Sequence, residues 1–325
     1  MSVAPTLHAA TRNRGGHSVT DGTVPGVGLP SVRRHADLLV IGGALVTPNG
    51  VDRADVACAA GRIVALGDLQ RSWTADATLH AKGLHVLPGV IDSQVHFREP
   101  GLTHKETLEA GTRGAVLGGV TAVFEMPNTQ PLTLRAEDLR AKLDAARGRA
   151  WCDHAFYIGG SSVNAEHLEY LESLPGCAGV KVFMGSSFGD LLADEDEVLC
   201  RILAHGRRRM AVHAEDEARL RDRKVIAESS GDVRQHPVWR AASSALLATQ
   251  RIVKLAGDTG RRLHILHVST AEEIAFLSDR KDRVTVEVTP HHLTLEAPEC
   301  YERLGTLAQM NPPVRERCHR NALWQ

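Results

Sequence analysis

A run of polar side chains follows one apolar stretch of this sequence and has the composition to bind a metal ion or move protons. After two apolar residues the chain reads Asp92-Ser93-Gln94-Val95-His96-Phe97-Arg98. Because side chains alternate along a strand, Asp92, Gln94 and His96 share one face. Histidine is the commonest metal ligand and the side chain that titrates nearest neutrality. A polar strand at a solvent edge is the alternative interpretation, but it does not explain the apolar start.

One lysine and two histidines stand in or at the end of other apolar stretches. Lys181 is surrounded by glycine, valine, phenylalanine and methionine, and a lysine is expensive to bury unpaired. The alternative is a lysine that extends its amine to solvent from a strand end. His213 and His267 each stand where an apolar stretch stops. His264 and His267 are three positions apart, so only one of them points inward on a regular strand.

These residues can form one site only if the strands that carry them end at the same edge of a sheet. Seven apolar stretches are typical of strands, at residues 90–96, 121–126, 154–158, 179–184, 210–213, 263–268 and 284–288. Stretches with apolar residues at helical spacing, such as 134–147 and 241–256, lie between them. Repeated βα units predict a parallel sheet or a barrel, and seven strands are one short of a (β/α)8 barrel. In such a barrel the carboxyl ends of the strands form the catalytic rim.

The N-terminal part of the chain has a different character. Residues 37–87 read as short strands separated by Gly and Pro-Asn-Gly turns, which predicts a small β module. Residues 1–36 are rich in Arg, Gly, Ser, Thr and Pro without apolar periodicity, and we expect a disordered tail rather than a transit peptide. The predicted organisation is therefore a tail at 1–36, a β module at 37–87 and an incomplete barrel at 88–325.

The composition excludes several classes of protein. The 38 Lys+Arg balance 39 Asp+Glu, so the formal charge of −1 gives no electrostatic case for nucleic acid or an anionic membrane. No stretch reaches the ~18 apolar residues of a membrane span. The six cysteines form no C-x-x-C pair, which argues against a disulfide scaffold or zinc ribbon and favours a reducing, cytoplasmic location.

Several motifs in order resemble those of dihydroorotases, within the cyclic amidohydrolases. The resemblance runs over residues 37–325 and rests on Leu87-Pro88-Gly89-Val90-Ile91-Asp92, His96-x-Arg98-Glu99-Pro100-Gly101, Gly118-Gly119-Val120-Thr121, Glu125-Met126-Pro127-Asn128-Thr129 and Asn311-Pro312-Pro313-Val314-Arg315. It implies a TIM-type metallo-amidohydrolase barrel whose last strand is missing from this chain. The family opens with Asp-x-His-x-His, whereas this chain has Gln94 at the first histidine position.

The resemblance also implies the roles of individual residues. His96, His213, His267 and a carbamylated Lys181 would bind one or two zinc ions, with the deeper site complete. Gln94 is a poor ligand for such an ion compared with imidazole, so its part in the site stays open. Arg98, Asn128 and Asn311 match substrate contacts. The general acid–base Asp of the family would lie on the eighth strand, beyond Gln325, so no catalytic residue is expected in this sequence.

Dihydroorotase is the function that the resemblance implies: reversible hydrolysis of dihydroorotate to N-carbamoyl-L-aspartate in pyrimidine biosynthesis. Arg98 favours it over relatives whose rings lack a carboxylate, because a guanidinium binds a carboxylate through two hydrogen bonds. One alternative is another cyclic-amide hydrolase, of the allantoinase or dihydropyrimidinase type. Another is an inactive dihydroorotase-like subunit. Besides a small-molecule substrate, the expected partners are a second copy of the chain or aspartate transcarbamoylase, and we expect this chain alone to be poorly active.

Overall fold

The computed structural model describes residues 33–186 and 189–325 of the chain. It divides into two compact units, one ending at Pro88 and one beginning at Gly89. Most of the predicted tail, residues 1–32, lies outside the described residues, and its last residues already belong to the first strand, which begins at Arg34. Among the described residues, none of the helices combines the length and the apolar composition that a membrane span requires.

The N-terminal unit consists of two small sheets. The four-stranded sheet has the order β5-β4-β1-β6 and the three-stranded sheet the order β3-β2-β7. Ala36, Leu39, Ala57, Leu69 and Trp73 form the buried core of the larger sheet. The strands are β1 (Arg34–Ile41), β2 (Ala44–Thr47), β3 (Gly50–Arg53), β4 (Asp55–Ala59), β5 (Arg62–Gly67), β6 (Trp73–His80) and β7 (His85–Val86).

The C-terminal unit is built on a parallel sheet of seven strands in sequence order, with β8 and β14 at its edges. All seven predicted strands are confirmed, with ends shifted by a few residues. They are β8 (Val90–Val95), β9 (Val120–Glu125), β10 (Asp153–Gly159), β11 (Cys177–Phe183), β12 (Met210–His213), β13 (Leu263–Ile265) and β14 (Val284–Val286). Strand β11 is buried over nearly its whole length, as expected for a parallel sheet covered on both faces.

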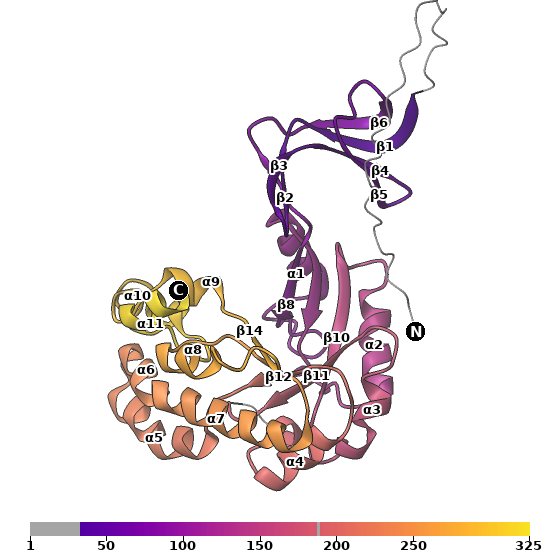
Figure 1. Ribbon diagram of the computed structural model, residues 1–325. Helices are drawn as coiled ribbons and strands as arrows, with labels where there is room; N and C mark the ends of the chain where they lie inside the picture. The colour runs from indigo at the N-terminus through magenta and orange to yellow at the C-terminus, as the bar shows by residue number, and fades with distance from the viewer. Residues whose placement is uncertain (1–32, 187–188) are drawn as a thin grey trace, which may run out of the picture. The chain divides into compact units, whose positions relative to one another are not determined.

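Helices connect successive strands and cover the outside of the sheet (Figure 1). The α-helices are α1 (Leu108–Leu117), α2 (Ala136–Ala146), α3 (Leu168–Leu171), α4 (Asp196–Ala204), α5 (Glu217–Ser230), α6 (His236–Trp239), α7 (Ala242–Thr259), α8 (Ala271–Leu277), α9 (Pro290–Thr294), α10 (Glu299–Leu304) and α11 (Arg317–Leu323). The longest, α7, buries a stripe that includes Ala245, Ala248, Ile252 and Ala256, and it ends at Gly260 in the left-handed conformation.

A side-chain contact joins the two edge strands of this sheet. The Ser93 hydroxyl of β8 donates a hydrogen bond of 2.8 Å to Glu287, which directly follows β14. The sheet is therefore curved enough for residues 194 positions apart to meet inside it. Curvature of this kind brings the carboxyl ends of β8 to β14 around a common space, as in a TIM-type barrel.

The residue Phe97, just after β8, the first strand of this sheet, packs tightly against helix α1. Phe97 follows β8 and is buried, and Gly111 of α1 leaves room for its ring. A Cβ atom on Gly111 would lie 2.2 Å from Phe97 Cδ1, whereas a Cβ on Gly114 of the same helix would meet nothing within 4 Å.

We predict that Gly111→Ala destabilises the chain by about 1–3 kcal/mol, because an added methyl group must displace the Phe97 ring. Gly114→Ala is the matched control and should stabilise by about 0.5–1 kcal/mol, since alanine loses less backbone entropy in a helix. Urea unfolding followed by circular dichroism measures both. Equal unfolding midpoints for the two variants would contradict the packing described for Phe97.

Candidate active site

One cavity of about 840 Å³ opens where the strands of the parallel sheet end. Most of its lining comes from the carboxyl ends of β8, β11, β12 and β13 and from the loops after β9 and β14, and residues 90–91, 120 and 309–311 complete it. All eight residues that the sequence predicts for the site line it: Gln94, His96, Arg98, Asn128, Lys181, His213, His267 and Asn311. The roles assigned to them stay predictions, but their convergence on one cavity is a property of the structure.

His213 and His267 face each other at the bottom of this cavity. Both are 4% exposed, and His213 Nδ1 lies 2.9 Å from His267 Nε2. The rings meet edge to face, with centroids 4.8 Å apart. Burial lowers the pKa of both imidazoles, and for His267 the neighbouring His213 and Lys181 add to that effect. The pair is therefore held neutral, which is the form of histidine that binds metal ions.

Glu215 and Arg240 hold His213 from its other side. Glu215 Oε2 is 2.9 Å from His213 Nε2, and Arg240 Nε donates to Glu215 Oε1 at 3.2 Å. Burial raises the pKa of Glu215, but the charge of Arg240 and the hydrogen bond from His213 outweigh it and bring the pKa to about 2. Glu215 is thus ionised at neutral pH. The sequence did not predict the pair of Glu215 and Arg240, although Glu215 stands only two positions after His213.

Lys181 is buried in the middle of β11 with its amine in the cavity. The side chain has no exposed surface, and Nζ has no hydrogen-bond partner among the described residues. Nζ lies over the ring of Phe183, 4.4 Å from the ring centroid. Burial lowers the pKa of this amine well below its usual value, against a smaller opposing influence of Glu287. A buried lysine of this kind is a nucleophile at neutral pH.

His96 and Asn128 form a hydrogen-bonded pair at the side of the cavity. His96 Nδ1 lies 2.8 Å from Asn128 Oδ1, so His96 Nδ1 donates its proton there and leaves Nε2 free. Burial, helped by the charges of Arg98 and Lys181, lowers the pKa of His96 to about 3. Asn128 is predicted as a substrate contact, and in this structure its carbonyl oxygen is engaged by His96. Asn311 is exposed and donates to Ser186 Oγ at 3.1 Å.

Glu287 is a cavity residue that the sequence did not single out. It accepts hydrogen bonds from Ser93 at 2.8 Å and from His264 Nε2 at 3.0 Å. His264 also bonds Thr285 on the neighbouring strand, which is consistent with His267 rather than His264 facing His213. No local motif marks Glu287, because its partners are distant in the sequence.

Backbone strain is concentrated at this cavity. Four non-glycine residues of the described chain have positive φ: Ala60, Arg98, Ser186 and His267. The last three line the cavity, with φ of 67°, 60° and 39°. Each such conformation costs of order 1–3 kcal/mol and persists only where the surroundings impose it. The surrounding structure, rather than local backbone preference, therefore sets the positions of Arg98 and His267.

Lys181, His213 and His267, with His96 beside them, are the residues of this cavity that fit a metal ion. Three buried atoms that line it have no partner among the described residues: Lys181 Nζ, His267 Nδ1 and Gln94 Oε1. A buried polar atom without a partner is unfavourable by about 1–3 kcal/mol, so such atoms indicate a missing ligand. No three His, Cys, Asp or Glu residues of the described chain converge as a ready-made metal site. The fit therefore depends on Lys181.

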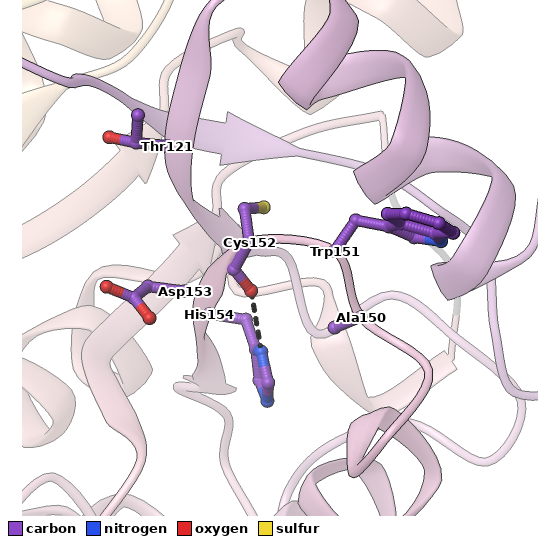
Figure 2. A pocket seen from close by; sticks show the side chains of 6 residues that line it. All are labelled: Thr121, Ala150, Trp151, Cys152, Asp153 and His154. Carbon is purple, nitrogen blue, oxygen red and sulfur yellow. Dashed lines mark hydrogen bonds between the residues drawn. The ribbon is translucent and has the colours of Figure 1, made fainter. Parts of the chain in front are cut away.

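A second cavity, of about 690 Å³, lies at the opposite, amino ends of β9 and β10 (Figure 2). It is lined by Thr121, Asp153, His154 and the residues 150–152. Its histidine, His154, bonds the carbonyl oxygen of Cys152 at 3.2 Å, as the dashed line in Figure 2 marks. It contains none of the predicted site residues.

Comparison with known proteins identifies the family. The model of the amidohydrolase family matches residues 85–306, which is more than half of the chain. The chain belongs to the amidohydrolase family.

Two curated relatives of this amidohydrolase are allantoinases. The allantoinase of Deinococcus radiodurans is 34% identical over 299 residues, covering 89% of this chain and 66% of that protein. The allantoinase of Salmonella gallinarum is 32% identical over 304 residues, with the same two shares covered. The chain thus spans 66% of the length of these relatives.

Two similar solved structures are hydantoinases. An L-hydantoinase (dihydropyrimidinase) from Arthrobacter aurescens has a TM-score of 0.82 at 27% identity, covering 89% of this chain and 66% of that one. A D-hydantoinase from a Bacillus species has a TM-score of 0.76 at 27% identity, covering 88% and 65%. These structures confirm the TIM-type amidohydrolase fold that the sequence predicts.

The prediction of a dihydroorotase is wrong, because the relatives are allantoinases and the similar structures hydantoinases. The glycines of the motifs that suggested it serve the scaffold. A Cβ on Gly89 would lie 2.1 Å from Thr121 Oγ1, and a Cβ on Gly101 would lie 2.2 Å from the Gln130 carbonyl oxygen. Such glycines allow segments to pack and carry no information about the substrate. Three further expectations depended on the dihydroorotase prediction and lose their basis: a role in pyrimidine biosynthesis, a transcarbamoylase partner and an inactive dihydroorotase-like subunit.

We predict that a divalent metal ion such as Zn²⁺ stabilises this amidohydrolase through Lys181, His213 and His267. At a concentration 100 times its dissociation constant, a ligand bound only to the folded state adds about 2.7 kcal/mol. His267→Ala should lose this stabilisation, because it removes one of the two facing imidazoles. His154→Ala is the control and should keep it. Thermal unfolding with and without Zn²⁺ measures the effect, and a full metal-induced shift in His267→Ala would refute the assignment.

Proposed function

We propose that this chain carries the metal-dependent active site of a hydrolase that opens cyclic ureides, with allantoin as the first candidate substrate. The observation that carries the proposal is the convergence of Lys181, His213 and His267 at the bottom of a cavity lined by Arg98. The relatives support the substrate class, because the allantoinases are 32–34% identical and the similar structures are hydantoinases. Allantoin and hydantoin both contain a five-membered ring with amide bonds.

The reaction is the hydrolysis of one ring amide. The oxygen of a water molecule adds to the ring carbonyl carbon, the bond from that carbon to the ring nitrogen breaks, and a proton is transferred to the nitrogen. The products are a carboxylate and a ureido group on one open chain. Zinc, when bound by the nitrogen donors of this cavity, would polarise the ring carbonyl and make water more acidic. The metal identity and the Asp expected beyond Gln325 stay predictions.

Arg98 fits the product of this reaction rather than a carboxylate on the ring. Ring opening creates a carboxylate from a neutral amide, so negative charge develops on the carbonyl oxygen as the reaction proceeds. Arg98 lines the cavity with a half-buried guanidinium. A preorganised cation that meets developing charge lowers the barrier more than it strengthens substrate binding. This role reconciles Arg98 with a substrate that has no carboxylate of its own.

Six unpaired cysteines support a reducing, cytoplasmic location for the protein. An assembly with a second copy of the chain stays a prediction.

Lys181 is the residue that would complete the donor set by carbamylation. A neutral amine attacks carbon dioxide, forms a nitrogen–carbon bond and loses a proton, which gives an anionic group with two oxygen donors. The lowered pKa of Lys181 favours the neutral amine, and its unpartnered Nζ leaves the attack unobstructed. Lys142 is equally buried but is paired with Glu125 at 2.6 Å.

We predict that ¹³C-labelled bicarbonate produces one carbamate resonance in the metal-loaded chain, assigned to Lys181. Lys181→Met should abolish the resonance. The double variant Glu125→Gln with Lys142→Met removes the other buried lysine together with its partner and should leave the resonance intact. Carbon NMR measures all three proteins, and a carbamate signal that survives in Lys181→Met would exclude Lys181 as the carbamylated residue.

We predict that the metal-loaded protein releases a carboxylate and a ureido product from allantoin or hydantoin. Arg98→Met should lower kcat/KM by about 10- to 100-fold, mainly through kcat, because a hydrogen bond to a charged group contributes about 1.5–3 kcal/mol. Lys105→Met, which removes an exposed cation nearby in sequence, is the control and should change little. Product formation followed by chromatography is the measurement. Turnover of carbamoyl-aspartate but of neither ureide would overturn the proposed function.

A further inference from the structure

We propose that Glu215 is a positioning residue that fixes the tautomer of His213, so that His213 presents Nδ1 to the cavity as a bare acceptor for a cation. The inference deepens the proposed function, on which its catalytic meaning rests. It concerns a carboxylate that is completely buried behind the histidine pair and does not line the cavity.

The contacts of Glu215 determine where the proton of His213 lies. Glu215 Oε2 is 2.9 Å from His213 Nε2, and Arg240 reaches both carboxylate oxygens, with Nε bonded to Oε1 and Nη2 to Oε2. A guanidinium keeps its charge in proteins, and the carboxylate paired with it can only accept hydrogen bonds. His213 Nε2 must therefore carry the hydrogen. In a neutral imidazole this leaves Nδ1, which faces His267, without one.

The surrounding contacts make this arrangement rigid. Arg240 is 3% exposed, and its carbonyl oxygen accepts a 2.6 Å hydrogen bond from Arg315 Nη1. Arg315 Nε also donates to Ser269 Oγ, two residues after His267. Arg315 thereby connects the segment that holds Glu215 with the segment that carries His267. Arg315 ends the Asn-Pro-Pro-Val-Arg motif and has no role in the proposed chemistry. These contacts give it a structural role.

A second buried ion pair of the same unit shows what a merely structural pair looks like. Glu172 and Arg261 lie 2.7 Å apart and are as deeply buried as Glu215 and Arg240. The remaining bonds of Glu172 come from the backbone amides of Arg207 and Arg208, the latter at 3.0 Å, and no histidine of the described residues hydrogen-bonds to it. The Glu172 pair therefore ties loops together, whereas the Glu215 pair ends on an imidazole that faces the cavity. Glu172→Gln is a matched control for Glu215→Gln.

The experiment reads the tautomer and the metal affinity of the full chain. In metal-free protein labelled with ¹⁵N-histidine, at a pH where the imidazole is neutral, long-range ¹H–¹⁵N NMR should show His213 protonated at Nε2. In Glu215→Gln the two tautomers should both be populated, because an amide can donate as well as accept. The affinity for Zn²⁺ should fall by about 10- to 100-fold in Glu215→Gln and stay within about 3-fold in Glu172→Gln.

Two results would overturn the proposal: protonation of His213 at Nδ1 in the unsubstituted chain, or equal Zn²⁺ affinities in the two variants. The tautomer measurement needs no variant, so the proposal is testable even where Glu215→Gln fails to fold. Neither readout depends on turnover. A protein that hydrolyses no cyclic ureide but shows both expected results refutes the proposed function and leaves the role of Glu215 intact.

Discussion

Burial of one amine without a partner is the constraint on which the candidate site depends. Lys181 lies on a strand whose other side chains are apolar, and the free energy of burying a charged ammonium there would be prohibitive. The fold tolerates Lys181 because its pKa is lowered and because the cavity beside it offers a place for a ligand. The rest of the site follows from that condition. His213 and His267 are also buried, and burial lowers their pKa, so all three side chains favour the neutral form.

Two buried ion pairs lie outside the cavity lining. Arg240 and Glu215 neutralise each other, and Glu125 and Lys142 form another buried pair at the end of β9. Buried ion pairs of this kind contribute little net stability, but removal of one partner leaves an uncompensated charge. They are therefore better understood as devices that hold neighbouring groups in one arrangement. The contact between Glu215 and His213 is the case in which the neighbouring group is a predicted ligand.

The sequence was sufficient to predict the scaffold and the convergence of the site residues. Seven apolar stretches predicted seven parallel strands, and the rule that strand ends meet brought Lys181, His213 and His267 together correctly. It was not sufficient for contacts between distant residues, such as Ser93 with Glu287, because no local pattern records them. The substrate was predicted wrongly for a related reason. Residues such as Gly89 and Gly101 are required by packing, and Arg98 is compatible both with a substrate carboxylate and with a product carboxylate.

Gln94 makes the two sides of the cavity chemically unequal. On one side, His213 and His267 offer imidazole nitrogens next to Lys181. At the end of β8, His96 bonds Asn128 through Nδ1 and keeps Nε2 free, whereas Gln94 contributes only an amide oxygen that lacks a partner among the described residues. An amide oxygen is a harder and weaker donor to zinc than imidazole. A first cation would therefore be held mainly by the buried side. The Gln94 side is then left for the weaker binding of a second ion, or for the polar edge of the substrate itself.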